Sequence, residues 1–102
     1  MVRLQLPREK IATFCEQHQV KKLWLFGSVL RDDFGPDSDV DVLVEFAAGA
    51  AHSLFDMVRM EQELGQLLGR DVDLIERAVL EQSENYIRRR DILGSLEAVH
   101  VA

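Results

Sequence analysis

The chain has 102 residues, 47% of them apolar and 29% charged, which is typical of one folded domain with one modest core. The formal net charge of −6 argues against extensive direct binding to nucleic acid, and no apolar run approaches the roughly 20 residues of a membrane span. The single cysteine, Cys15, allows no internal disulfide, which fits a reducing cytoplasm. With the lack of a long apolar run, this leads us to expect a cytoplasmic protein that makes no membrane contact.

Residues 8–18 predict the first helix. Their apolar residues Ile11, Phe14 and Cys15 recur at intervals of three and four, so one helical face is expected to be buried. His18, at the end of this segment, is interpreted as a solvated residue, and a role as a metal ligand is the less favoured alternative.

Two strands separated by a turn and a loop are predicted next. Residues 21–26 are apolar without alternation, so this strand is expected to be covered on both faces. Residues 28–31 favour a short helical turn, and residues 32–38 are expected to form a polar loop because of their turn-forming residues. Residues 39–46 then predict a second strand with alternating apolar side chains.

The second half of the chain predicts helix, strand and helix. Ser53 is an N-cap candidate with Asp56 three residues later, and Gly69 is placed to end that helix. Residues 70–76 predict a third strand, and residues 81–99 a closing helix.

The resulting order of elements is α-β-α(short)-β-α-β-α. It predicts a single α+β domain over residues 1–102, with a core over about 8–98 and a small mixed sheet packed with helices. In the closing helix, Tyr86 occupies an apolar position and is expected in the core. The basic run 88–90 is interpreted as a solvated helix face, with a nucleotide tail or an acidic partner surface as the alternatives.

Two aspartates stand at the start of the otherwise apolar second strand. Asp39 and Asp41 are two residues apart, so they share one face and lie about 6.6–6.8 Å apart along it. Mg²⁺ is commonly held by one or two carboxylates together with substrate phosphates, so the pair is a candidate metal–phosphate site. The alternative is that both are solvated acids at the mouth of a strand.

Gly27 and Ser28 follow the first strand directly. A glycine here lets the backbone approach a ligand closely, and the amides of a following helical turn favour phosphate. With ten residues between this pair and Asp39-Val40-Asp41, the spacing resembles the Gly-Ser-x10-Asp-x-Asp signature of the nucleotidyltransferase superfamily that includes DNA polymerase beta and kanamycin nucleotidyltransferase. The chain most resembles the minimal nucleotidyltransferases, the MNT-domain proteins, over about residues 8–98.

Positions outside the signature also agree with that family. They are Leu25-Phe26, Arg31, Ser38 and Val72-Asp73-Leu74.

The resemblance implies a role for each matching residue. Gly27 and Ser28 would contact the triphosphate of the nucleotide, and Asp39 and Asp41 would bind one or two Mg²⁺ ions. Asp73 resembles the third carboxylate of the family, which would bind metal and help to activate the attacking hydroxyl.

Two of these assignments leave alternatives open. Asp71 is expected on the same strand face as Asp73 and competes with it, although the Val-Asp-Leu context favours Asp73. Arg31 occupies the arginine position of the family and is a candidate for nucleotide binding, or else it forms a surface salt bridge to Asp32 or Asp33.

The resemblance also implies a function. Minimal nucleotidyltransferases act as the antitoxin of a toxin–antitoxin pair, transferring AMP from ATP to a tyrosine hydroxyl of a HEPN-domain toxin. The alternative is an antitoxin that neutralises its HEPN partner by binding alone. Transfer to a small molecule such as an aminoglycoside is disfavoured because the chain has no room for a separate substrate domain. A homo-oligomer is possible.

Overall fold

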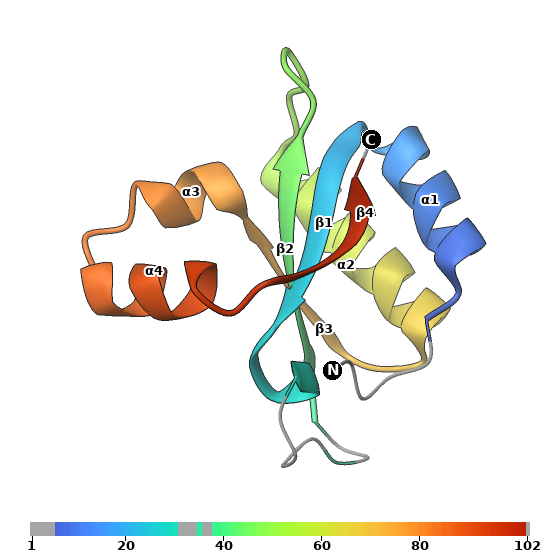
Figure 1. The fold of residues 1–102 in the computed structure, drawn as a ribbon. Helices are drawn as coiled ribbons and strands as arrows, with labels where there is room; N and C mark the ends of the chain where they lie inside the picture. Colours follow the sequence, from blue (N-terminus) through green and yellow to red (C-terminus); the bar gives the residue numbers. More distant parts are fainter. Residues whose placement is uncertain (1–5, 31–34, 36–37, 102) are drawn as a thin grey trace.

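The computed structural model describes residues 6–30, 35 and 38–101, which form a four-stranded sheet covered by helices (Figure 1). The strands are β1 (Val20–Phe26), β2 (Val40–Phe46), β3 (Val72–Glu76) and β4 (Glu97–Val101). The helical elements are α1 (Arg8–Gln17), the 3₁₀ turn η1 (Gly27–Leu30), α2 (Leu54–Leu68), α3 (Arg77–Glu81) and α4 (Tyr86–Leu93). This mixed sheet with its helices confirms the predicted α+β class.

The strand order across the sheet is β3-β2-β1-β4. β1 runs antiparallel to both β2 and β4, whereas β2 and β3 are parallel. A parallel pair needs a crossover connection, and α2 supplies it between β2 and β3. The starts of β2 and β3 therefore lie at the same edge of the sheet, where β1 ends.

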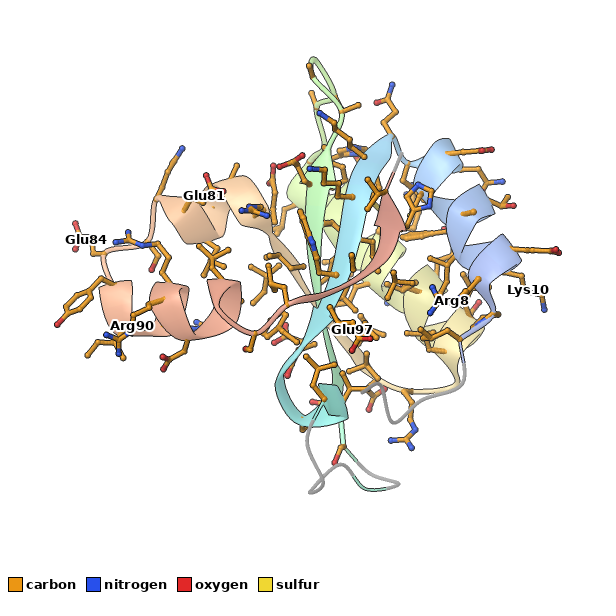
Figure 2. The ribbon with its side chains drawn as sticks, in the orientation of Figure 1. Arg8, Lys10, Glu81, Glu84, Arg90 and Glu97 are labelled. Atoms are coloured by element: carbon orange, nitrogen blue, oxygen red, sulfur yellow. The ribbon has the colours of Figure 1, made fainter. Side chains whose placement is uncertain are left out.

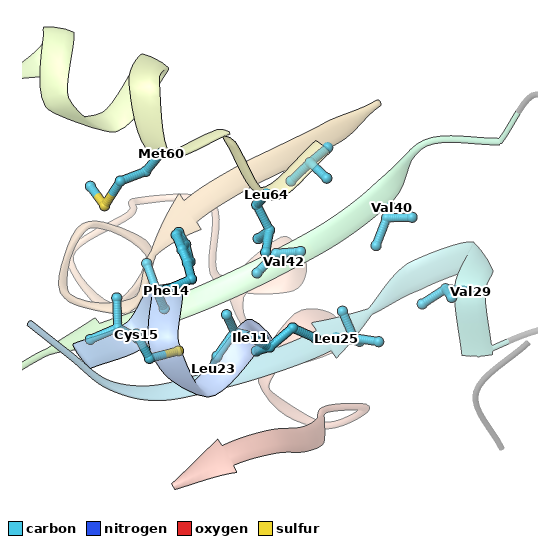
Figure 3. Close-up of a cluster of buried hydrophobic side chains, with 13 residues drawn as sticks. Ile11, Phe14, Cys15, Leu23, Leu25, Val29, Val40, Val42, Met60 and Leu64 are labelled. Atoms are coloured by element: carbon cyan, nitrogen blue, oxygen red, sulfur yellow. The ribbon is translucent and has the colours of Figure 1, made fainter. Parts of the chain in front are cut away.

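The main core fills one face of the sheet, beneath α1 and α2 (Figure 3). Alternation along β2 sends Val40, Val42 and Val44 to this face, where α2 contributes Met60 and Leu64. All five side chains are almost completely inaccessible to water. Burial of this continuous apolar layer is the main stabilising contribution that we assign to the fold.

A smaller apolar cluster lies on the opposite face, where α3 and α4 pack (Figure 1). It consists of Trp24, Phe26, Leu43, Leu80 and Ile92. Because two of these residues belong to β1, the prediction that this strand is covered on both faces is confirmed.

Helix α2 begins and ends as its sequence predicts. The Ser53 hydroxyl accepts a hydrogen bond from the Asp56 amide at 3.1 Å, and the Asp56 carboxylate accepts one from the Ser53 amide at 2.9 Å. The bond from the Ser53 backbone holds the pKa of Asp56 below its ordinary value. Gly69 ends the helix with a φ of +66°. No helix in the described part of the chain has the length and apolar character that crossing a membrane requires.

The prediction of one closing helix over residues 81–99 is wrong. The chain forms α3 and α4 and then the strand β4, which pairs with β1. The Asn85 side chain accepts a hydrogen bond from the Arg88 amide at 3.1 Å and so starts a new helix, which stops at Gly94. The β4 segment then satisfies the open edge of β1, a long-range requirement that local periodicity does not reveal.

Two predictions for single residues are also corrected. Tyr86 is 60% exposed, since it lies at the first position of α4 while Ile92 carries the buried contact of that helix. The His18 ring packs against Phe14 in a tilted arrangement and its Nε2 lies 2.8 Å from Glu63 Oε2, so this side chain links α1 to α2 rather than being solvated.

Candidate active site

Asp41 and Asp73 are neighbours on the two parallel strands. The register of β2 and β3 pairs Asp41 with Asp73, flanked by the pairs Val40–Val72 and Val42–Leu74. Neighbouring strands are about 4.8 Å apart. The alternation that sends the valines into the main core turns both carboxylates to the opposite face, where α3 and α4 lie.

Gly27 lies directly beside Asp41. Phe26, the last residue of β1, pairs with Asp41, and Gly27 then turns the chain into η1 with a φ of +76°. A Cβ atom at this position would overlap Asp41 Oδ2. Glycine is therefore favoured here by the backbone conformation, and any other side chain would also displace the Asp41 carboxylate.

One cavity of about 650 Å³ contains these residues. Its sheet side is lined by Phe26, Gly27, Asp41 and Asp73. Its helical side is lined by Asn85, Ile87, Arg88, Asp91, Ile92 and Ser95, which belong to α4 and the residues flanking it. The cavity thus joins the end of β1, the aspartate pair and α4.

Asp39 lies apart from that pair. It is exposed, precedes β2, and lines a second cavity of about 920 Å³ together with Asp71 and residues of α2. Within the described ranges, no group of three or more His, Cys, Asp or Glu residues is placed to hold a metal ion. The structure therefore brings Asp41 and Asp73 together without Asp39, and it places Asp73 rather than Asp71 beside Asp41.

The second cavity is larger, but its position argues against it as the place where Asp41 and Asp73 would act. It lies between α2 and the start of β3, and Asp41 and Asp73 do not line it. We place the candidate site in the smaller cavity, because there a strand end, Gly27 and the paired carboxylates converge.

Ser28 connects the turn to the first aspartate. Its hydroxyl is 3.5 Å from the backbone oxygen of Asp39, a long contact that ties η1 to the residue before β2. Arg31, the remaining residue predicted to bind nucleotide, lies outside the described residues.

The paired carboxylates fit a magnesium–phosphate site. Mg²⁺ is commonly bound by one or two carboxylates, with substrate phosphates and waters completing its octahedron. Asp41 and Asp73 supply that number of carboxylates on adjacent strands. A cation between them would also offset the repulsion of two negative charges held side by side.

Sequence analysis missed Arg70. One guanidinium nitrogen of this residue, Nη1, donates to the backbone oxygens of Gly35 at 2.7 Å and Ser38 at 3.2 Å. It thereby anchors the segment that leads into Asp39. Its only sequence signal was its position directly after the glycine that ends α2.

The residues of α4 were not assigned to the site either. The arginine run was interpreted as a solvated helix face, with a nucleotide tail or an acidic partner surface as alternatives, and Arg88 and Arg90 are exposed in the structure. Asn85 was the available signal, since an Asn followed by helix formers favours a new helix start.

Comparison with known proteins identifies the family. Residues 8–96 match the nucleotidyltransferase domain family. A protein of Methanocaldococcus jannaschii, provisionally named protein adenylyltransferase MJ0435, is 41% identical over 68 residues, which are 67% of this chain and 71% of that protein. The protein adenylyltransferase MntA of Thermococcus cleftensis is 38% identical over 65 residues, which are 64% of this chain and 64% of MntA. The chain therefore matches less than two thirds of the length of MntA.

Solved structures show the same fold. A chain of a toxin–antitoxin complex with AMP-PNP has a TM-score of 0.71 and 20% identity, with 95% of this chain and 75% of that chain covered. A complex of the tri-AMPylated HEPN toxin of Shewanella oneidensis with an MNT antitoxin gives a TM-score of 0.63 at 20% identity, covering 93% and 70%. A structure provisionally described as a minimal nucleotidyltransferase reaches 0.66 at 31% identity, covering 88% and 86%. The family match over residues 8–96 and this shared fold show that the chain belongs to the nucleotidyltransferase domain family.

Proposed function

We propose that the protein is a Mg²⁺-dependent nucleotidyltransferase that moves AMP from ATP to a hydroxyl of a HEPN-domain toxin and thereby acts as an antitoxin in the cytoplasm. The observation that carries this proposal is the pairing of Asp41 with Asp73 beside Gly27 in one cavity. Family membership supports nucleotidyl transfer as the reaction class.

The acceptor is proposed from the relatives. MJ0435 and MntA carry the name protein adenylyltransferase, and one structural neighbour is a complex between an AMPylated HEPN toxin and an MNT antitoxin.

Each proposed residue has a distinct task. The backbone of Gly27 and the hydroxyl of Ser28 bind the phosphate chain of ATP at the end of β1. Asp39, Asp41 and Asp73 are the proposed metal ligands, of which Asp41 and Asp73 lie in the cavity itself. Bound Mg²⁺ supplies neutralisation of the phosphate charge and orientation of the phosphate oxygens.

The proposed transfer is an in-line displacement at the α-phosphorus. The acceptor hydroxyl oxygen forms a bond to this phosphorus while the bond to the bridging oxygen of the β-phosphate breaks. Asp73 takes the hydroxyl proton, and pyrophosphate leaves with the electron pair of the broken bond. The products are an adenylylated acceptor and pyrophosphate.

The test follows radiolabel from the α-phosphate of ATP onto the HEPN partner. We compare the unmodified protein with Asp41→Asn and with Glu45→Gln, which alters a carboxylate on the same strand outside the cavity. We expect label on the partner with the unmodified protein and with Glu45→Gln, and at least about a hundredfold less with Asp41→Asn.

Neutralisation of the toxin is measured in parallel. If Asp41→Asn forms a stable complex and neutralises the toxin fully without transferring label, the protein acts by binding alone. Equal labelling by all three proteins would remove Asp41 from the mechanism.

A further inference from the structure

The three consecutive arginines of α4 have different surroundings. Arg89 Nη1 donates to the backbone oxygen of Ser83 at 2.7 Å and approaches that of Glu81 at 3.4 Å, so this arginine holds the turn between α3 and α4. Arg90 extends from α4 on the side away from the sheet, as Figure 2 shows. Its Nε lies 3.8 Å from Asp91 Oδ1, and both side chains are largely exposed.

Arg88 is the member of the run that lines the cavity containing Asp41 and Asp73. The Asn85 side chain fixes its place in the fold, because the cap bond to the Arg88 amide makes this residue part of the first turn of α4. The guanidinium of Arg88 forms no ion pair within the described part of the chain, in contrast to that of Arg90. Its charge is therefore available to a ligand.

The charge distribution in the cavity indicates what kind of ligand this is. Among the described residues, the ionisable side chains that line the cavity are those of three aspartates, Asp41, Asp73 and Asp91, and one arginine, Arg88. A cavity lined by several carboxylates and a guanidinium suits a ligand with its own negative charges and a bound cation. A metal-bound phosphate chain has this character, and the planar guanidinium fork matches the spacing of phosphate oxygens.

We propose that Arg88 binds the phosphate chain of the nucleotide from the α4 side of the cavity, opposite Gly27. The assignment of the ligand as ATP rests on the function proposed above. Arg88 is a substrate-binding residue in this scheme. It adds positive charge from the helical side, while the aspartates hold the cation from the sheet side.

The test is calorimetric titration of the purified protein with ATP and Mg²⁺, with adenosine as the phosphate-free ligand. Arg88→Gln removes the charge, Arg88→Lys keeps the charge without the fork, and Arg90→Gln is the matched control on the same helix. A charge-assisted contact to phosphate predicts about tenfold to hundredfold weaker ATP binding for Arg88→Gln and a smaller loss for Arg88→Lys. Arg90→Gln binds within about twofold of the unmodified protein, because an exposed ion pair contributes little.

Adenosine distinguishes phosphate binding from a general disturbance of the cavity. Arg88→Gln and the unmodified protein are expected to bind adenosine equally, and matching circular dichroism spectra and melting temperatures check that the variant is folded. Unchanged ATP binding by Arg88→Gln, or an equal loss of ATP and adenosine binding, would overturn the proposal.

The outcomes separate this proposal from the proposed function. If the unmodified protein binds ATP and labels its partner while Arg88→Gln behaves identically, the role of Arg88 is wrong and the function stands. If it binds ATP in an Arg88-dependent manner but labels no partner, the protein adenylyltransferase function is wrong and the phosphate site stands. If the unmodified protein binds no ATP, both are wrong.

Discussion

The two faces of the sheet are built from the same strands but have opposite characters. The face beneath α1 and α2 is a closed apolar layer that includes Val40 and Val42. The other face is only partly covered by α3 and α4, and it carries Asp41 and Asp73 beside a cavity. Adjacent residues of one strand are thus assigned to stability and to chemistry, which predicts that the two properties can be changed separately.

The largest effect on stability is expected from a cavity in the apolar layer beneath α1 and α2. Leu64→Ala removes a side chain that is 1% exposed, so it should lower the free energy of unfolding by about 2–5 kcal/mol. Leu54→Ala is the matched control, since Leu54 lies on the same helix but is 79% exposed, and it should cost less than about 0.5 kcal/mol. Urea denaturation of both variants provides the measurement. Similar losses would mean that α2 is not held by its buried face.

The second prediction concerns Gly27, which lines the cavity on the sheet face that carries Asp41 and Asp73. Gly27→Ala and Gly49→Ala both place a Cβ on a backbone with positive φ, +76° and +83°, which costs about 1–2 kcal/mol each. Only at Gly27 does the new atom overlap the Asp41 carboxylate, whereas the space beside Gly49 is open.

Transfer activity therefore separates the two glycine variants. Gly27→Ala should lose at least about tenfold of its AMP-transfer rate, because a misplaced metal ligand raises the barrier, while Gly49→Ala keeps the rate of the unmodified protein. Equal rates for both variants would show that the position of Asp41 does not depend on Gly27.

The smallest expected effect is the pH dependence of stability that Cys15 causes. It tests whether water reaches the apolar layer beneath α1 and α2. Burial raises the pKa of the Cys15 thiol from 9.0 to about 12, so the folded state favours the neutral thiol. The stabilising contribution of this neutral thiol is complete below pH 9 and is lost as the pH rises towards 12. Denaturation at pH 8 and pH 10.5 should show a smaller decline for Cys15→Ala than for the unmodified protein. Identical declines would mean that water reaches this face.

Local sequence pattern was sufficient to predict the first three strands and the two longer helices. The sequence predicted both ends of α2, because Ser53, Asp56 and Gly69 make their capping contacts with residues that are close in the chain. The site was predictable to the extent that alternation places Asp41 and Asp73 on one face of the sheet, although their direct pairing depends on the register of β2 and β3.

The missed features all depend on contacts between distant segments. Local periodicity predicted a single helix in place of α4 and β4, because nothing near Gly94 reveals that β1 has an open edge with which the last strand can pair. Arg88 was predicted on a solvated helix face and its side chain is exposed, but its place at the cavity could not be predicted, since the cavity exists only after α4 packs over the sheet. The separation of Asp39 from the aspartate pair depends on where β2 begins. The ends of a strand are the hardest part of it to predict from sequence.

The parallel register of β2 and β3 also bears on the fidelity of folding. A slip of β3 by one residue would turn Asp73 into the apolar layer and Val72 out of it, because successive side chains point to opposite faces. Burying an unpaired carboxylate in this layer would cost several kcal/mol, so the misregistered sheet is strongly disfavoured. The same aspartate that is proposed to serve the reaction thus also penalises an incorrect strand alignment, and a chain that reaches its stable fold already has its two carboxylates side by side.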